Sequence, residues 1–348
     1  MTRNDAERLD RALSSVTGLA DEMLVLDTGS TDSTHEVVKK RGARLIEYPW
    51  PGRFDEPLNF MLDHVETEWV LRLDSDEWLD RQFHDLVRKV MAEESVFFVS
   101  LNRRDYGPGG QYNDILQNRL WRNHPILRYI GCVHEQMPDA ILNEAAEGRQ
   151  HIFLDIRLDH DGYLEGLTAD RLQRNLDLIE LELEERPGSV FYEICRADTL
   201  FVMKDPRAFD ALGEVVKRLM KREAPLDGIA SAAIAQYLRA LPDDRRRHPQ
   251  TGKVLAFARE HFQRFPDVQW QVARTEYSRQ NLREAWDTMV QLDRRAQAGE
   301  FSKQIGVNPL VLTTLLWQTM AELAPMIGKP ELVAGLRQRI MAHERRHG

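Results

Sequence analysis

Apolar and polar positions alternate in two different ways along the chain, with the change near residue 166. Before it, short apolar runs predict buried strands, and stretches with apolar residues at three- and four-residue spacing predict helices. The expected strands are 22–27, 44–48, 69–74, 96–102, 116–121 and 151–158, and the expected helices are 5–16, 33–41, 57–65 and 81–93. This alternation predicts an α/β fold with a parallel sheet, which we expect to become mixed around a turn at 106–110.

From about residue 167 the pattern is helical only. Prolines that precede or begin predicted helices, Pro187, Pro225 and Pro266, lie 38 and 41 residues apart, close to the period of helix-pair repeats. The sequence therefore predicts an α/β domain at 1–166 and an all-α, tetratricopeptide-like domain at 167–348. A generic helical bundle is an equally good interpretation of the second domain.

Composition narrows the class of protein. With 348 residues, 42% of them hydrophobic, the chain is long and apolar enough for two folded domains. Residues 1–165 carry 31 acidic and 19 basic side chains, and such an acidic half repels nucleic-acid phosphates. No apolar run approaches the ~18 residues of a membrane span. The first residues are too polar for a signal peptide. Two cysteines indicate no disulfide framework, which favours the cytoplasm.

The strongest chemical signal is Asp74-Ser-Asp76 at the end of the predicted strand 69–74. In open α/β sheets, ligands bind at the carboxyl ends of the strands, and the first predicted strand also ends in an aspartate, Asp27. Two carboxylates one residue apart offer hard oxygen ligands that hold Mn²⁺ or Mg²⁺ against a diphosphate. Asp-x-Asp alone is common in solvated turns, so the neighbouring motifs decide the interpretation.

The neighbouring motifs form an ordered set. They are Asp27-Thr-Gly-Ser-Thr-Asp-Ser-Thr34, Tyr48-Pro-Trp-Pro-Gly-Arg-Phe54, Leu58-Asn-Phe60, the Asp74-Ser-Asp76 segment, Arg119-Leu-Trp-Arg-Asn123, Gly131-Cys-Val-His-Glu-Gln136 and Leu158-Asp-His-Asp-Gly-Tyr163. In this order they resemble glycosyltransferase family 2, the inverting nucleotide-sugar enzymes of GT-A fold, and most of all the subgroup in which a helical-repeat domain follows. The resemblance covers about 1–185. It implies a Rossmann-like mixed sheet that carries the Asp-x-Asp motif.

The resemblance implies roles for individual residues. Asp27 and Gly29 match the strand-ending aspartate and the tight-turn glycine that help to bind the nucleotide. Asp74 and Asp76 match the metal and diphosphate motif, with Asp76 as the direct ligand. His160 matches a late histidine that can complete the metal shell, although a lone histidine is more often structural.

On the acceptor side, Glu135 matches the position of the acidic base in inverting relatives. His134 beside it is expected to orient the loop or to touch the donor sugar. Asp159 and Asp161 are alternative bases, because they flank a histidine of the same cleft.

Three further polar residues have competing interpretations. Asp32 is expected to cap the following helix rather than to bind a ligand. Arg119 and Arg122 suit phosphate, because a guanidinium matches phosphate oxygens. Solvated arginines at strand edges are nevertheless the commoner outcome.

The resulting functional hypothesis is an inverting, metal-dependent transfer of sugar from a UDP-sugar, with Mn²⁺ or Mg²⁺ as cofactor. The acceptor stays open between a peptide, a lipid-linked glycan and another glycan, and nucleic acid is disfavoured by charge. We expect the helical domain to position the acceptor or to form a homodimer.

Two departures from the family pattern favour a rival hypothesis, a catalytically silent scaffold that binds a peptide or protein partner. The chain begins at Met1, the methionine of the family's Met-x-x-Asn-Glu motif, so most of the first strand is missing. Leu58 stands where the family has an arginine, which removes a charge near the donor. The carboxylates and the histidine of the motifs favour an enzyme.

Two other rivals fail on the sequence. Val25-Leu-Asp-Thr-Gly-Ser30 is an aspartic-protease signature, but a second Asp-Thr/Ser-Gly is missing and a helix is predicted after it. His343-Glu-Arg-Arg-His347 fits a zinc-protease template, but no third ligand follows and a terminal helix cannot wall a cavity.

Overall fold

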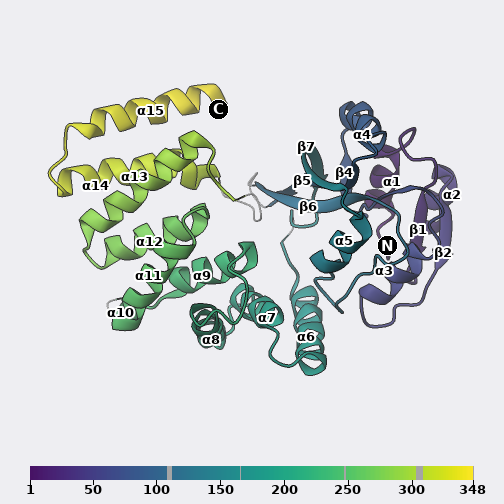
Figure 1. Cartoon of the computed structure of the whole chain (residues 1–348), viewed down its shortest axis with the longest axis horizontal. Coiled ribbons are helices and arrows are strands. Elements are labelled where there is room, and N and C mark those ends of the chain that lie inside the picture. The colour runs from purple at the N-terminus through teal and green to yellow at the C-terminus, as the bar shows by residue number, and fades with distance from the viewer. Residues whose placement is uncertain (108–111, 165, 247, 303–308, 348) are drawn as a thin grey trace. The chain divides into compact units, whose positions relative to one another are not determined.

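The computed structural model describes residues 1–107, 112–164, 166–246, 248–302 and 309–347. It divides into two compact units, Met1–Glu185 and Arg186–Gly348 (Figure 1). The first unit is α/β and the second is all-α, which confirms the predicted fold class. The predicted turn at 106–110 falls partly outside the described residues. No described helix is both long and apolar enough to cross a bilayer.

Among the described residues, the first unit contains two sheets. β1 (Leu24–Asp27) and β2 (Arg44–Glu47) form a parallel pair. The larger sheet has the strand order β3, β6, β5, β7, β4, with bounds Trp69–Leu71, Tyr112–Arg122, Val96–Tyr106, Gln150–His160 and Glu77–Leu79. Its pairs are antiparallel except for β5 with β7. The expected mixed sheet is confirmed, and β4, which the sequence did not predict, forms by pairing with β7.

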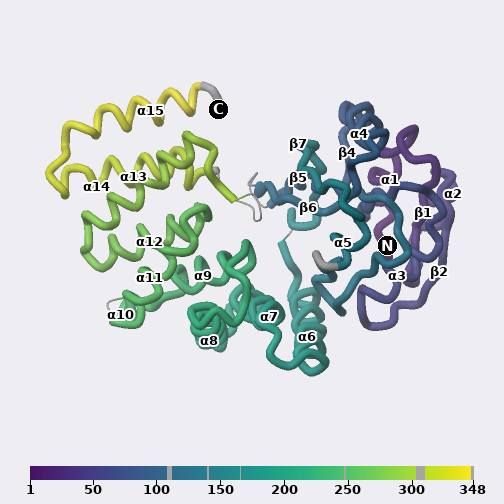
Figure 2. Tube along the Cα trace, in the orientation of Figure 1, coloured from purple at the N-terminus to yellow at the C-terminus, as the bar shows by residue number. Residues whose placement is uncertain are grey.

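The helices of this unit alternate along the chain with single strands or with pairs of strands, as Figure 2 traces. They are α1 (Ala6–Ser15), α2 (Thr34–Arg41), α3 (Asp55–Leu62), α4 (His84–Met91), α5 (Asp139–Ala146) and α6 (Ala169–Glu185), with a short 3-10 turn, η1 (Arg81–Phe83), before α4. In α1, Leu9, Ala12 and Leu13 are buried at three- and four-residue spacing, so its apolar face packs on the core.

The N-termini of α1 and α2 meet at one carboxylate. Asp32 accepts hydrogen bonds from the N–H of Ala6 at 3.2 Å and from the N–H of Thr34 at 3.0 Å. These residues begin α1 and α2, and their first N–H groups have no partner within the helix. Asp32 therefore caps both helices.

Helix α6 belongs to the first unit, which ends at Glu185, whereas the sequence places the domain boundary at 166/167. Leu172, Leu176 and Ile179 are buried along one face of α6. Further along, the Glu182 carboxylate accepts a hydrogen bond from the backbone N–H of Cys132. The sequence indicates a helix here, but not which unit covers it.

The second unit consists of helices. They are α7 (Val190–Val202), α8 (Ala208–Met220), α9 (Gly228–Ala240), α10 (Asp243–Arg246), α11 (Pro249–His261), α12 (Pro266–Ser278), α13 (Leu282–Ala298), α14 (Thr314–Met326) and α15 (Leu332–His347), with the 3-10 turn η3 (Pro309–Leu312) before α14. Neighbours along the chain pack in pairs, namely α7 with α8, α12 with α13 and α14 with α15. Pro266 begins α12, as the sequence predicts. This pairing agrees with a helical-repeat domain.

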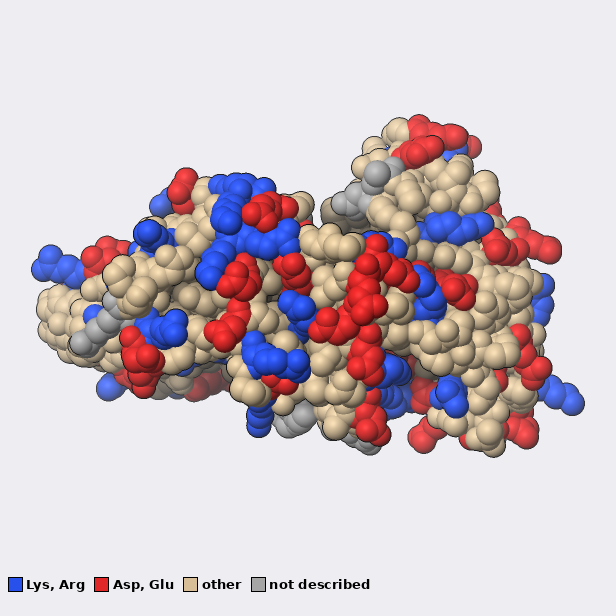
Figure 3. Space-filling model, turned by 90° about the horizontal axis from the view of Figure 1, so that it is seen from below, with Lys and Arg blue, Asp and Glu red and all other residues tan. Residues whose placement is uncertain are grey.

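Charged side chains of both signs are interspersed on the face shown in Figure 3. Among its coloured residues, Lys and Arg form separate clusters rather than one continuous stripe.

Candidate active site

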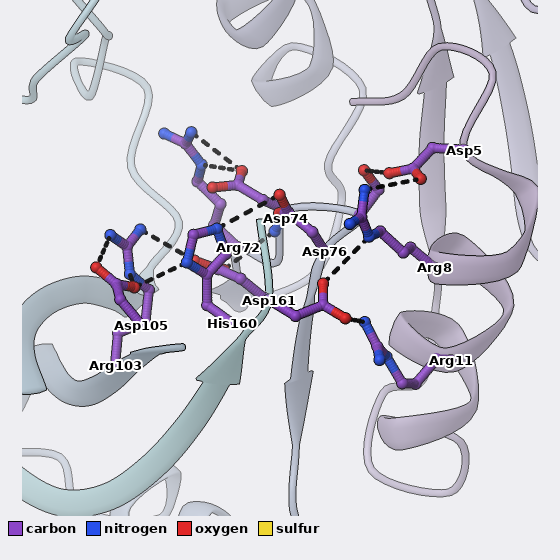
Figure 4. Close-up of polar contacts among 12 residues, drawn as sticks. Asp5, Arg8, Arg11, Arg72, Asp74, Asp76, Arg103, Asp105, His160 and Asp161 are labelled. Carbon is purple, nitrogen blue, oxygen red and sulfur yellow. Dashed lines mark hydrogen bonds and ion pairs between the residues drawn. The ribbon is translucent and has the colours of Figure 1, made fainter. Parts of the chain in front are cut away.

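The Asp-x-Asp segment lies in the turn between β3 and β4, beside the end of β7 (Figure 4). The pairing of β4 with β7 sets Glu77 opposite His160. As a result, Asp76 Oδ2 lies 3.4 Å from His160 Nε2. The structure thus brings together two residues that the sequence assigns to one metal site.

A third residue orients the His160 ring. Asp105, which β5–β7 pairing places opposite His160, accepts a hydrogen bond from His160 Nδ1 at 2.8 Å. Arg103 Nε contacts the same carboxylate of Asp105 at 2.7 Å. Burial lowers the pKa of His160, but the bonds to Asp105 and Asp76 outweigh it and raise that pKa to about 9. A carboxylate behind one ring nitrogen, with the other directed into the site, is the usual support of a metal-binding histidine.

Gly162 allows Asp76 and His160 to approach its backbone closely. A Cβ atom there would lie 2.3 Å from Asp76 Oδ2 and 2.6 Å from His160 Nε2. Both distances are far below a van der Waals contact, so a side chain at 162 would displace one of the two groups. The two groups are a carboxylate oxygen and an imidazole nitrogen, a donor set that suits Mn²⁺ and also accommodates Mg²⁺.

Asp74 lies between two arginines. Its Oδ1 is 3.2 Å from Arg72 Nη2, and its Oδ2 accepts a hydrogen bond from Arg119 Nη2 at 2.9 Å. Burial raises the pKa of Asp74, but Arg72 and Arg119 outweigh it and hold that pKa well below its usual range. Asp74 is therefore ionised, and its charge is largely balanced by Arg72 and by Arg119 of β6.

Arg119 is buried, and Glu77 is its second partner. Glu77 is fully buried, and its Oε1 accepts from Arg119 Nη2 at 2.5 Å and from Arg103 Nη1 at 3.3 Å. Its other oxygen accepts the backbone N–H of Asp74 at 3.1 Å. The guanidinium of Arg119, expected from sequence to face phosphate, is thus engaged by carboxylates behind the Asp-x-Asp turn.

The His-Glu segment lies in a tight loop that an isolated bridge between Ile130 and Gln136 closes. His134 is exposed and has a φ of 52°, in the left-handed region. Glu135 is largely buried, and its Oε1 accepts a hydrogen bond from Arg72 Nη2 at 2.7 Å. One nitrogen of Arg72 therefore contacts both Asp74 and Glu135.

Three side chains from other elements hold this loop in place. Asn59 on α3 exchanges two hydrogen bonds with the backbone of Tyr129, at 2.9 and 2.8 Å. Asp55 accepts the N–H of Gly131 at 3.2 Å. Glu182 on α6 accepts the N–H of the next residue, Cys132. The loop that carries Glu135 is fixed from two helices at once.

Asp27 ends β1 in a closed turn. Its Oδ2 accepts hydrogen bonds from the N–H of Ser30 at 2.9 Å and of Gly29 at 3.3 Å, and lies 3.0 Å from His35 Nε2. Burial raises the pKa of Asp27, but the bonds from Ser30, His35 and Gly29 outweigh it and lower that pKa. Gly29 has a φ of 104°, which favours glycine. Asp27 therefore shapes the turn after β1.

The two alternative bases are both paired. Asp159 accepts the hydroxyl of Tyr106 at 2.7 Å, and because successive strand residues point to opposite faces, it points away from His160. Asp161 is held by Arg8 at 3.2 Å and Arg11 at 2.5 Å (Figure 4).

The first part of the chain matches a known family. A family model described as glycosyl transferase family 2 matches residues 1–142. These residues are a glycosyl transferase family 2 domain.

Relatives of this domain include proteins with helical repeats. A TPR repeat-containing protein of Synechococcus elongatus is 34% identical over 143 residues, 41% of this chain and 35% of that protein. The SPbeta prophage-derived glycosyltransferase SunS of Bacillus subtilis is 25% identical over 228 residues, 63% of this chain and 52% of that protein. The chain thus spans between a third and about half of the length of these two relatives. The structure of S. aureus TarS 1–349 in complex with UDP-GlcNAc aligns with 86% of this chain and 90% of that one, at 14% identity and a TM-score of 0.39.

Several residues of the family 2 domain that border the site were missed by sequence reasoning. The sequence could have pointed to Arg72, because it is the one charged residue in the apolar run 69–73. Glu77 directly follows the Asp-x-Asp motif. Nothing in the sequence points to Asp105, because only the register of β5 against β7 places it beside His160.

Another group of potential ligands in the first unit serves the loop instead. Cys132, Glu182 and Glu185 have potential ligand atoms within 4.8 Å of one another. Burial and the contact with Glu182 raise the pKa of Cys132 to about 12. The exposed Glu185 pairs with Arg53 at 3.4 Å. We interpret this cluster as an anchor.

Proposed function

We propose that the protein is an inverting glycosyltransferase that moves a sugar from a UDP-sugar to an acceptor hydroxyl or thiol. The observation that carries the proposal is the link made by Arg72 between Glu135 and Asp74, next to the pair of Asp76 and His160. A proton acceptor and a cation-binding pair on one site are what inverting transfer needs. Membership of residues 1–142 in glycosyl transferase family 2 supports the same reaction class.

Asp76 and His160 would hold a divalent cation, Mn²⁺ or Mg²⁺. The approach of both groups to the same side of Gly162 and the support of His160 by Asp105 favour this assignment. When bound, the cation would offset negative charge on the departing diphosphate. Asp74 contributes less to binding it, since two arginines already occupy its oxygens.

Glu135 is the proposed base. As the acceptor oxygen or sulfur attacks the anomeric carbon, its proton passes to the Glu135 carboxylate. The bond from the anomeric carbon to the diphosphate oxygen breaks, and its electron pair leaves with UDP. Arg72 orients the carboxylate, and the loop anchors Asn59 and Glu182 keep it in place.

The nucleotide is proposed to lie along the carboxyl ends of the strands. The turn after β1, which Asp27 and Gly29 shape, lies at this edge. Leu58, where the family has an arginine, is buried in a cluster with Trp121 and Tyr129, so α3 supplies no charge at that position.

The test is donor hydrolysis, which needs no acceptor. We expect one sugar of a nucleotide-sugar panel to be hydrolysed slowly by the full chain, and faster with Mn²⁺ than with a chelator. Asp76→Asn should lower this rate by roughly 10²–10³, the usual cost of a lost preorganised electrostatic contact. Asp85→Asn, an exposed carboxylate paired with Arg88, is the control and should leave it unchanged. Equal rates in Asp76→Asn and the control would contradict the assignment.

A further inference from the structure

One edge of β7 is covered by another strand only at its end. β7 runs from Gln150 to His160, and along one side it pairs with β5. On the other side β4 pairs with residues 158–160, as the strand order of the sheet shows (Figure 1). In the part of the chain that the structure describes, residues 150–157 therefore have an unpaired edge. Such an edge presents backbone N–H and C=O groups that a further strand can pair with.

Two backbone hydrogen bonds show which residues of β7 face this edge. The N–H of Gln150 donates to Ser95 O on the β5 side at 2.7 Å, and the N–H of Asp161 donates to Asp76 O on the β4 side at 3.2 Å. Successive residues of a strand direct their backbone groups to opposite edges. The even-numbered residues of β7 therefore face β5, and the odd-numbered residues within 151–155 face the open edge.

The middle of the open edge exposes an aromatic side chain. Phe153 is 60% exposed, and its ring centroid lies 4.7 Å from that of His151 on the same face of the sheet. Ile152 and Leu154 point to the opposite face, where they pack against the hydrophobic core of the first unit. Proteins commonly protect an open edge with Lys or Pro, and residues 150–157 contain neither. An exposed aromatic ring on an unprotected edge indicates a surface that a partner covers.

The sequence along the edge is complementary to itself when it is read in the opposite direction. In the segment His151-Ile-Phe-Leu-Asp155, an aromatic residue is central, apolar residues flank it, and the two ends are a basic and an acidic residue. Antiparallel pairing about Phe153 sets the two Phe153 rings opposite each other, Ile152 opposite Leu154 and His151 opposite Asp155. Aromatic pairs and opposite-charge pairs across strands both stabilise antiparallel sheets. This register also brings together the backbone groups of the odd-numbered residues, as hydrogen-bonded pairs require.

We propose that β7 pairs with β7 of a second copy of this chain, antiparallel and about a two-fold axis at Phe153. The same residues then form both sides of the interface, as in other two-fold dimers. The register of β7 against β5 shifts after Leu154, which limits the pairing to about five residues. An interface this small predicts a dimer that dissociates at micromolar concentrations. Phe153 lies about 23 Å along the strand from His160, at ~3.3 Å per residue, so the dimer does not depend on the proposed reaction.

The first experiment is analytical ultracentrifugation of the full chain between about 1 and 100 μM. Phe153→Asp sets two carboxylates opposite each other at the axis, so the dissociation constant of the dimer should rise at least about tenfold. Val202→Asp makes the same kind of change at an exposed apolar position of α7 and is the control, with circular dichroism to verify folding. A chain that is monomeric throughout this range, or a dimer that persists in Phe153→Asp, would overturn the proposal.

Exchanging the charges tests the register. His151→Glu and Asp155→Lys each set like charges opposite each other, so each should weaken the dimer. The double variant His151→Glu/Asp155→Lys restores an opposite-charge pair and should recover most of the affinity. His151 also contacts Ser100 Oγ at 2.8 Å, and a loss that came only from this contact would not be recovered in the double variant. A double variant that dimerises no better than either single one would therefore overturn the register about Phe153.

Discussion

The absence of one side chain shapes the proposed cation site. Gly162→Ala places a Cβ 2.3 Å from Asp76 Oδ2 and 2.6 Å from His160 Nε2, so one of these groups must move. We expect the affinity for Mn²⁺, measured by calorimetry in the presence of UDP, to fall at least about tenfold, as second-sphere changes at metal sites do. Gly213→Ala in α8 is the control, because a Cβ there meets only an ordinary contact at 3.8 Å. Unchanged Mn²⁺ affinity in Gly162→Ala would place the cation elsewhere.

The proton acceptor can be tested at the same scale. Glu135→Gln keeps the shape of the side chain but cannot take the proton, so turnover should fall by roughly 10²–10⁴. Donor KM should change little. The same change at the two alternative bases, Asp159→Asn and Asp161→Asn, is made for comparison. Initial rates of sugar transfer are measured for all three variants. A small loss of rate in Glu135→Gln together with a large loss in one of the aspartate variants would identify that aspartate as the base instead.

At the scale of elements, the sequence predicted what is local. The strand that ends in Asp27, the helix after it and the Asp74-Ser-Asp76 turn all follow from periodicity and turn residues. The pairing of β5 with β7, which sets Asp105 beside His160, depends on long-range register that no local pattern records. Helix α6 was predicted as a helix but was assigned to the second domain. Its contact with Cys132 joins residues 50 positions apart, and no local sequence pattern indicates such a contact.

That contact yields a prediction for an element far from the Asp-x-Asp turn. Glu182→Ala leaves the buried N–H of Cys132 without its acceptor, which typically costs about 1–3 kcal/mol of stability. The loop should loosen, so kcat should fall about tenfold with donor KM nearly unchanged. Glu182→Gln retains an acceptor and should restore most of the rate. Glu185→Gln, one turn further along α6 at an exposed position, is the control and should behave as wild type. An equal loss of kcat in Glu182→Ala and Glu182→Gln would argue against a positioning role of Glu182.

At the scale of the molecule, the two compact units predict where the chain can be cut. A chain that ends after Glu185 keeps α6 and the anchor of the Glu135 loop, so it should retain donor hydrolysis. If the helical unit binds the acceptor, this chain should lose sugar transfer. A chain that ends after residue 166 lacks Glu182 and should lose hydrolysis as well. Both are measured as UDP release, with circular dichroism to verify folding, and transfer by the 1–185 chain would show that the helical unit is dispensable for the acceptor.

Arg72 has a consequence for the order of events in a catalytic cycle. Its Nη2 lies 3.2 Å from Asp74 and 2.7 Å from Glu135, so the two carboxylates share one guanidinium group. A diphosphate that binds near Asp74 competes for the Arg72 guanidinium and weakens the hydrogen bond from Arg72 to Glu135. We therefore expect the nucleotide sugar to bind before the acceptor and UDP to leave last. In steady-state kinetics, UDP would then inhibit competitively against the donor and non-competitively against the acceptor.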